Sequence, residues 1–206
     1  MYMSYLDELN DSQRVAVEHI YGATMVIAGA GSGKTRVLTY RIAYMMEQGI
    51  DPFNILALTF TNKAAREMTE RIGKIVGGGE AKNITMGTFH SVFSKLLRFN
   101  ADRIGFPNNF TIYDSADSQK LIALVCKDLN LDPKRYPPRQ FASIISNAKN
   151  ELLGPADYLN STSNQYEQIC ADVYSLYQKR LGQANAMDFD DLIMRTVEVV
   201  QRFPEV

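Results

Sequence analysis

Hydrophobic and polar positions follow two different periods in the first half of the chain. Four short runs of mostly hydrophobic and β-branched residues predict strands at residues 24–28, 55–59, 84–88 and 110–113. After each of the first three runs, hydrophobic residues recur every three or four positions, which predicts helices. These helical stripes are Leu38, Ile42 and Met45, then Ala65, Met68, Ile72 and Ile75, then Val92, Phe93, Leu96 and Leu97. Strands that alternate with helices favour a parallel sheet with right-handed crossovers, covered on both faces.

Beyond residue 115 the strand-like runs stop and only helical stripes remain. The three stripes are Ile122, Val125 and Leu129, then Phe141, Ile144, Ile145 and Ala148, then Tyr166, Ile169, Cys170, Val173, Tyr177 and Leu181. A polar stretch at residues 160–164 predicts a loop before the longest helix. We therefore predict an all-helical block over residues 115–186.

Composition places the chain among soluble globular proteins. Its 206 residues are 46% hydrophobic and 22% charged, which allows a substantial core. Cys126 and Cys170 both fall in helical stripes and form neither a disulfide framework nor a paired metal motif, so we expect a reduced, cytoplasmic setting. The acidic N-terminus does not resemble a secretion signal, and no hydrophobic run is long enough to cross a membrane.

Charge and histidine content exclude two simple interpretations. The formal net charge of −1 carries no basic signature, so nucleic-acid binding cannot be argued from charge. His19 and His90 are the two histidines, and neither has a cysteine or carboxylate at ligand spacing, so no metal cluster is expected. Any function must therefore be argued from local motifs.

A phosphate-binding loop is the strongest of these motifs. The predicted strand at residues 24–28 runs into Ala28-Gly29-Ala30-Gly31-Ser32-Gly33-Lys34-Thr35, and an amphipathic helix follows. Glycines let backbone N–H groups turn toward phosphates, and the helix N-terminus adds partial positive charge. Lys34 should contact the β and γ phosphates and the Thr35 hydroxyl should help to hold Mg²⁺. The alternative, a chance glycine-rich turn, is disfavoured because strand, loop and helix agree, although Ala28 replaces the usual first glycine.

Three further segments resemble the superfamily 1 DNA helicases of the UvrD, PcrA and Rep type. Residues 9–13 are similar to the family's Q motif, residues 57–68 to motif Ia and residues 86–91 to motif Ib, in the family's order. The resemblance implies that Gln13 reads the adenine edge, and that Arg36 lies near the base. On its own, a glutamine such as Gln13 in the first turn of a helix is far more often merely solvated. The implied nucleotide-binding residues are Gln13, Ala28, Gly29, Ala30, Gly31, Ser32, Gly33, Lys34, Thr35 and Arg36.

The resemblance also implies a single-stranded DNA site at the ends of two predicted strands. Its residues are Phe60, Thr61, Asn62, Lys63, Thr88 and His90. Phe60 is a candidate for stacking on a base, but it could instead belong to the core. Thr61 and Asn62 could cap the following helix whether or not they also bind a DNA phosphate. His90 could likewise cap a helix or occupy a polar niche.

The resemblance implies an α/β architecture with a RecA-like P-loop core. Residues 1–114 would form the first part of motor domain 1A, residues 115–186 a helical 1B insertion, and residues 187–206 the return into domain 1A. Asp188 and Asp191 fit that return, but they also fit a helix N-cap and its third helical position, which is the interpretation we favour. The family's Asp-Glu-x-x-Asp segment would be expected beyond Val206.

The implied function is an ATP-dependent 3′-to-5′ DNA helicase of repair or replication. The cofactors would be ATP and Mg²⁺, and the substrates single-stranded DNA and junctions of single and double strands. Repair or replication proteins are expected partners, no membrane is expected, and the chain should be a monomer or a weak dimer. Two alternatives stay open: a helicase-nuclease subunit of the RecB or AddA kind, and a non-catalytic module that binds nucleotide or DNA. Without the missing carboxylates, this chain alone should not turn ATP over.

Overall fold

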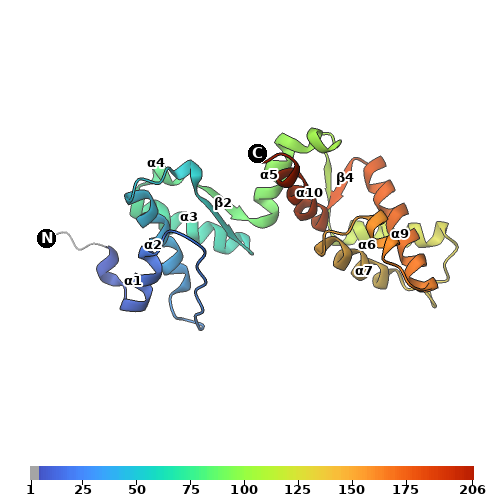
Figure 1. Cartoon of the computed structure of the whole chain (residues 1–206), viewed down its shortest axis with the longest axis horizontal. Coiled ribbons are helices and arrows are strands. Elements are labelled where there is room, and N and C mark those ends of the chain that lie inside the picture. The colour runs from blue at the N-terminus through green and yellow to red at the C-terminus, as the bar shows by residue number, and fades with distance from the viewer. Residues whose placement is uncertain (1–4) are drawn as a thin grey trace. The chain divides into compact units, whose positions relative to one another are not determined.

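The computed structural model describes residues 5–206, and these form two compact units (Figure 1). Unit 1 is Met1–Val92 and unit 2 is Phe93–Val206, with helix α5 (Phe89–Asn100) crossing the boundary. Both units combine helices with a small parallel sheet, which fits the predicted α/β class. The single parallel sheet expected for the first half is not found within residues 5–206, because the strand predicted at residues 110–113 pairs with a strand of unit 2 and not with the strands of unit 1. The domain boundaries expected at residues 114 and 186 stay a prediction.

Unit 1 pairs two strands and surrounds them with helices. Its elements are η1 (Tyr5–Glu8), α1 (Asp11–Glu18), α2 (Lys34–Glu47), η2 (Pro52–Asn54), β1 (Leu56–Thr59), α3 (Asn62–Val76), α4 (Gly78–Ala81) and β2 (Thr85–Thr88). Strands β1 and β2 are parallel, in register from Leu56 opposite Thr85 to Thr59 opposite Thr88. The strands predicted at residues 55–59 and 84–88 are therefore confirmed to within one residue. Because the strands are parallel and in register, their carboxyl ends lie at the same edge of the sheet.

The core of unit 1 lies between the helices and this sheet. Met68 and Ile72 of α3 stand one turn apart and are almost fully buried, so one face of the helix packs inward. The residues of this buried cluster are Ile42, Ile55, Ala57, Met68, Ile72, Ala81 and Ile84. The opposite face of α3 is polar and stays exposed, which leaves its charged side chains available for contacts.

The strand predicted at residues 24–28 is wrong. The segment belongs to a long loop that leads from α1 to α2 (Figure 1), and Met25 and Ile27 are 85% and 90% exposed. An extended segment becomes a strand only when a neighbouring strand satisfies its N–H and C=O groups. Within residues 5–206 no segment pairs with it. Its composition is that of a buried parallel strand, so the pattern alone could not reveal the missing neighbour.

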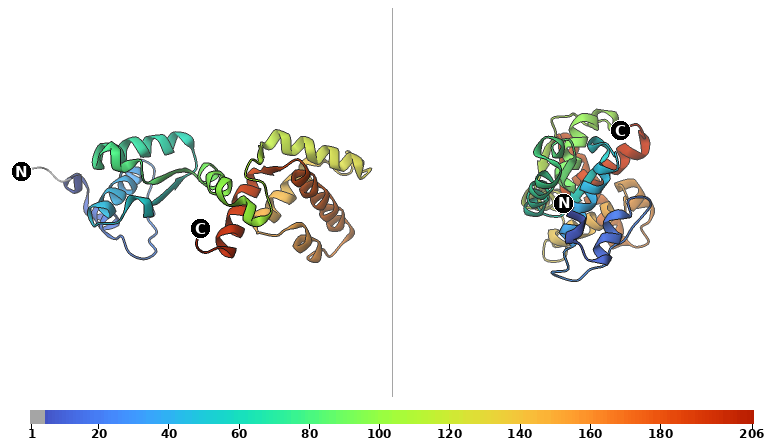
Figure 2. Two further views of the ribbon diagram at one scale, coloured as in Figure 1. Left: turned by 90° about the horizontal axis from the view of Figure 1, so that it is seen from above. Right: turned by 90° about the vertical axis from the view of Figure 1, so that its left-hand side faces the viewer.

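Unit 2 surrounds a second, shorter sheet with helices (Figure 2), of which α9 (Gln165–Gln183) is the longest. After α5 its elements are η3 (Ala101–Ile104), β3 (Thr111–Tyr113), α6 (Ser115–Asp128), α7 (Pro138–Asn150), α8 (Pro155–Asn160), α9 (Gln165–Gln183), β4 (Ala186–Asp188) and α10 (Phe189–Arg202). Strands β3 and β4 are parallel, from Thr111 opposite Ala186 to Tyr113 opposite Asp188. The strand predicted at residues 110–113 is confirmed as β3. The three helices predicted from hydrophobic stripes beyond residue 115 are confirmed as α6, α7 and α9. Strand β4 was missed because three residues are too few to display a period of two.

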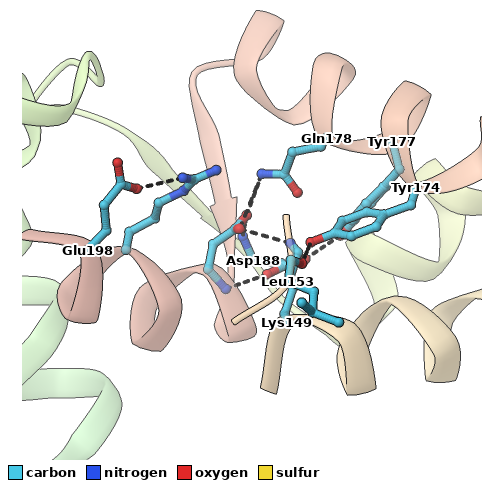
Figure 3. A network of polar contacts seen from close by, with 9 residues as sticks. Lys149, Leu153, Tyr174, Tyr177, Gln178, Asp188 and Glu198 are labelled. Atoms are coloured by element: carbon cyan, nitrogen blue, oxygen red, sulfur yellow. Dashed lines mark hydrogen bonds and ion pairs between the residues drawn. The ribbon is translucent and has the colours of Figure 1, made fainter. Parts of the chain in front are cut away.

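A buried network of charges joins α7, α9 and α10 in unit 2 (Figure 3). The Lys149 ammonium lies 2.7 Å from an oxygen of Asp188 and 2.9 Å from an oxygen of Asp191. Tyr177 donates a hydrogen bond of 2.7 Å to Asp188, and Gln178 donates to both oxygens of Asp191. The three charged side chains are nearly inaccessible to solvent, so each depends on the others for its stabilisation.

The same two acids begin helix α10, as predicted. Asp188 is the N-cap and accepts a hydrogen bond from the Asp191 N–H, and the Asp191 side chain accepts one from the Asp188 N–H. This reciprocal arrangement is a capping box with aspartate at the third position. Burial raises the pKa of Asp191, while the nearby Lys149 ammonium opposes that shift. The acids therefore start a helix and neutralise a buried cation at the same time.

Three further observations concern the helices, the polar clusters and the cysteines in the described part of the chain. None of the helices within residues 5–206 is both long and hydrophobic enough to cross a bilayer. In the same residues, no group of three or more His, Cys, Asp or Glu side chains is arranged to hold a metal ion. Cys126 and Cys170 are buried as free thiols.

Candidate functional site

The glycine-rich loop that precedes α2 adopts a conformation that only glycine accepts readily. Gly31 and Gly33 have φ angles of +76° and +85°, in the left-handed region that disfavours other residues. At Gly33 a Cβ atom would also lie 2.8 Å from the Gln13 side-chain nitrogen. Helix α2 begins at the next residue, Lys34, so the loop ends directly on a helix N-terminus. The loop can therefore surround an anion with backbone N–H groups.

Gln13 is held against this loop by hydrogen bonds at both ends of its amide. Its oxygen accepts from the Asn10 N–H at 3.2 Å, within a capping box that starts α1. Its nitrogen donates to the Ser32 carbonyl at 2.9 Å. One N–H and one oxygen lone pair remain after these two bonds, which is the donor and acceptor pair that an adenine edge requires. These contacts give Gln13 a role in the cap of α1 and against the loop, and its contact with adenine stays a prediction.

Lys34 extends over the loop and binds two of its carbonyls. Its ammonium donates to the Ala28 and Gly29 oxygens at 2.8 and 2.9 Å. The side chain is exposed, so these neutral acceptors can be exchanged for phosphate oxygens, which form stronger charge-assisted bonds. Thr35 follows at the second position of α2 and is also exposed. Its hydroxyl is therefore accessible to a cation that accompanies a phosphate.

A pocket of about 510 Å³ lies over the loop, a size typical of small-molecule sites. The lining residues are Gln13, Gly29, Gly31, Ser32, Gly33, Lys34, Thr35, Arg36 and Arg71. Of the ten residues that the sequence suggested for nucleotide, eight line this pocket. Ala28 and Ala30 belong to the loop but not to the pocket wall, and Ala28 contributes its carbonyl to Lys34.

The carboxyl ends of β1 and β2 bring the second group of candidates together. Phe60 follows β1 directly and is 89% exposed, so the alternative that placed it in the core is wrong. Its ring centroid lies 5.4 Å from that of Phe89, the residue that follows β2, with the ring planes tilted by 39°. Two aromatic rings at one sheet edge, one of them almost fully exposed, can stack on a flat organic group.

Side chains around these rings also start the helices that follow the strands. Thr61 is the N-cap of α3 and accepts a hydrogen bond from the Ala64 N–H at 3.2 Å, as predicted. Asn62 and Lys63 are exposed in the first turn of α3. Thr88 ends β2, is 9% exposed and accepts from the Ser91 N–H at 3.2 Å. His90 is half-buried in the first turn of α5. A capping role for Thr61 does not exclude a ligand at the remaining N–H groups.

Sequence reasoning missed Arg71 and Phe89 as members of these two sites. Arg71 lies 37 positions after Lys34 in the chain and reaches the pocket only because α3 packs against α2. Phe89 lies within the segment compared with motif Ib, and its position directly after β2 was the available signal. No local pattern could have found Arg71, because charged residues on an exposed helix face are common.

The chain matches the family described as the UvrD/REP helicase N-terminal domain, over residues 9–206. It belongs to this family. The DNA helicase PcrA of Staphylococcus aureus, described as ATP-dependent, is 50% identical over 202 residues. The PcrA helicases of Bacillus subtilis and Staphylococcus epidermidis are also 50% identical, over 202 and 198 residues. These matches confirm the resemblance to the UvrD, PcrA and Rep type.

The alignments with these PcrA helicases cover almost all of this chain but a minor part of each relative. The alignment with the Staphylococcus aureus helicase includes 98% of this chain and 28% of that protein. For the Bacillus subtilis helicase the corresponding shares are 98% and 27%. The chain thus corresponds to a little over a quarter of the length of these relatives.

Proposed function

We propose that this chain is the N-terminal part of an ATP-dependent DNA helicase that moves 3′ to 5′ on single-stranded DNA. The observation that carries the proposal is the joint presence in unit 1 of a glycine-rich phosphate loop and an exposed aromatic pair at a sheet edge. Neither feature alone separates a helicase from other nucleotide-binding proteins. Family membership and the relatives' names favour the helicase.

The residues of the loop fit a nucleotide and its magnesium ion. Left-handed Gly31 and Gly33 leave room for phosphates to approach the backbone, and the N-terminus of α2 faces that space. Lys34 would leave its two carbonyl acceptors to bind the β and γ phosphates, while the Thr35 hydroxyl would help to hold Mg²⁺. Gln13 would present its remaining donor and acceptor to adenine, beside Arg36. Bound ATP supplies the phosphoryl bond whose hydrolysis drives movement.

The sheet edge fits a single DNA strand better than a duplex. Stacking on Phe60 requires a base with an open face, and only an unpaired strand presents its bases in this way. The N–H groups at the start of α3 and the Lys63 side chain can neutralise backbone phosphates near that base. His90 and Thr88 complete the candidate surface along β2. Junctions of single and double strands would be the natural substrates of such an enzyme.

We further propose the family architecture for this chain. A RecA-like motor domain would begin with residues 1–114 and resume near residue 187, and residues 115–186 would form a helical insertion. The helices α6 to α9 support the second assignment. In the full-length protein, nucleotide binding and hydrolysis would open and close a cleft beside the loop, and the strand would advance past Phe60 and His90. We expect action in the cytoplasm, in DNA repair or replication.

The proposal is tested by ATP hydrolysis in the full-length protein with and without single-stranded DNA. Single-stranded DNA should stimulate turnover, and Lys34→Ala should reduce it by roughly 100-fold or more because a preorganised cation is lost at the phosphates. The 206-residue chain assayed alone should show no stimulated turnover, since none of the carboxylates within residues 5–206 lines the pocket and phosphoryl transfer needs one to position the metal. Stimulated turnover that survives Lys34→Ala would contradict the proposal.

A further inference from the structure

A groove of about 440 Å³ lies on unit 2 where α7 packs against α9. It is lined by Arg139, Gln140, Ser143 and Ile144 of α7 and by Tyr166 of α9. Gln140 and Ile144 are four positions apart, so they lie on the same face of α7. The Tyr166 hydroxyl donates a hydrogen bond of 3.3 Å to the Gln140 side-chain oxygen, which joins the two helices. The groove is therefore part of the folded helix pair and needs no rearrangement to form.

The hydrophobic part of this groove is held in place by the core. Tyr166 is 40% exposed, and its ring lies nearly parallel to those of Tyr136 and Phe141, with centroids 6.3 and 6.5 Å away. Phe141 is buried in the core of unit 2, so this row of rings is anchored. Ile144 lines the same groove and is half-buried. A fixed hydrophobic surface loses little conformational entropy when a partner covers it, which favours binding.

Positive charge gathers at one end of the groove. Lys134, Arg135 and Arg139 are exposed, and they lie in the first turn of α7 or in the segment just before it. Within residues 5–206 none of these three cations forms an ion pair. The Arg135 guanidinium lies 5.2 Å from the centroid of Tyr136, the ring that stacks on Tyr166. The three cations are therefore available to a negatively charged ligand.

Hydrophobic surface beside unpaired cations selects the chemistry of the ligand. Amphipathic segments with apolar side chains and neighbouring carboxylates satisfy both parts of such a surface. A nucleic acid carries a phosphate at every nucleotide and needs cations along its whole path, whereas the groove is uncharged beyond Arg139. A second copy that docked symmetrically would place the same cations against one another. An acidic segment of another protein is the occupant that fits best.

We propose that the groove between α7 and α9 is a docking site for an acidic amphipathic segment of a partner protein. Aliphatic side chains of that segment would contact Ile144 and Tyr166, and its carboxylates would pair with Arg135 and Arg139. The site lies within unit 2, and the observations that support it are independent of the nucleotide and DNA sites proposed for unit 1. Unit 2 would thereby connect the enzyme to a partner while unit 1 binds nucleotide and DNA.

The test measures binding of a labelled peptide to the full-length protein by fluorescence anisotropy. The peptide carries leucine at every third or fourth position and glutamate between the leucines. It should bind about tenfold more tightly than a peptide with lysine for glutamate or one with serine for leucine. Arg139→Glu should weaken its binding about tenfold, because an attraction becomes a repulsion, and Ile144→Ser should weaken it by a similar factor. Lys179→Glu is the matched control and should leave affinity unchanged, since Lys179 is exposed on α9 about 20 Å along the helix from Tyr166.

Further measurements separate the possible occupants of the groove. Thermal unfolding should show that each variant is folded, and Arg139→Lys should retain most of the peptide affinity because it keeps the charge. No preference among the three peptides, or equal affinity in wild type and Arg139→Glu, would overturn the inference. If Arg139→Glu weakens single-stranded DNA binding as much as peptide binding, the groove belongs to DNA and the partner site is refuted. A dimer in light scattering that Arg139→Glu converts to a monomer would assign the groove to a second copy and refute it equally.

Discussion

The two units differ in where they place their polar chemistry. Unit 1 keeps its candidate residues exposed, on a loop and at strand ends, above a core of mostly small and aliphatic side chains. Unit 2 buries its most polar cluster, with Lys149 0% exposed beside Asp188, Asp191 and the large Tyr177 side chain. The polar groups of unit 1 are available to ligands, whereas those of the buried cluster in unit 2 are satisfied by one another.

This difference indicates that similar residues serve opposite purposes in the two units. A lysine over the phosphate loop can exchange its carbonyl partners for a ligand, and its replacement should change binding more than folding. A lysine buried between two carboxylates cannot exchange its partners for a ligand. Removing any one of the three groups would leave an unpaired buried charge. Variants can therefore test whether the polar groups of unit 1 bind ligands while the buried ones of unit 2 stabilise the fold by pairing with one another.

The largest expected effect concerns Lys149. Lys149→Ala should lower the free energy of unfolding of the cooperative unit that contains it by ~3–5 kcal/mol, because two carboxylates lose their buried counter-ion. Urea denaturation followed by circular dichroism measures this change. Lys127→Ala, an exposed control on α6, should shift it by about 0.5 kcal/mol or less. Equal effects for the two variants would contradict the network's role.

The next effect concerns Phe60 at the strand-binding edge. Phe60→Ala in the full-length protein should cost ~1–3 kcal/mol of single-strand affinity and leave ATP affinity unchanged. Stability should hardly change, because the ring is 89% exposed. Phe53→Ala is a matched control, since Phe53 is 72% exposed elsewhere in unit 1. Fluorescence anisotropy at several salt concentrations measures affinity, with a logarithmic slope of roughly −0.7 per neutralised phosphate. Similar losses for both variants would argue against stacking at Phe60.

A smaller effect is expected at the cap of α3. Thr61→Ala should lower the stability of unit 1 by about 1 kcal/mol, because the Ala64 N–H loses its acceptor, whereas Thr61→Ser should retain most of it. Thermal or urea unfolding measures this cost. Since Thr61 does not line the nucleotide pocket, ATP affinity should stay the same. An alanine variant as stable as the wild type would show that the cap contributes nothing.

The smallest effect is the pH dependence that Asp191 adds to unit 2. Burial raises the pKa of Asp191 in the folded state, against the opposing effects of Lys149 and Arg195 and with the support of Asp188. Between the ordinary and the raised pKa the folded state binds more protons, so this group's contribution to stability falls as pH rises. Relative to Asp191→Asn, the wild type should therefore gain stability as pH is lowered from 7 toward 4. A difference that is constant with pH would contradict the raised pKa.

The sequence by itself determined the features that depend on neighbouring residues. Alternating periods located α2, α3, α5, α6, α7, α9 and three of the strands. The cap residues Thr61 and Asp188 marked where α3 and α10 begin. The glycines of the phosphate loop were equally clear, because a left-handed backbone is a local requirement. The family resemblance was also readable from short motifs, since each occupies a few consecutive positions.

Tertiary structure alone decided which distant groups meet. Residues 24–28 have the composition of a strand but lack a pairing partner within the described chain, and Phe60 could not be assigned to surface or core without its burial. Arg71 joins the nucleotide pocket through helix packing, and Lys149 finds its two acids 39 and 42 positions further along the chain. Periodicity and propensity are properties of a segment, whereas pairing and burial depend on groups that only the folded chain brings together.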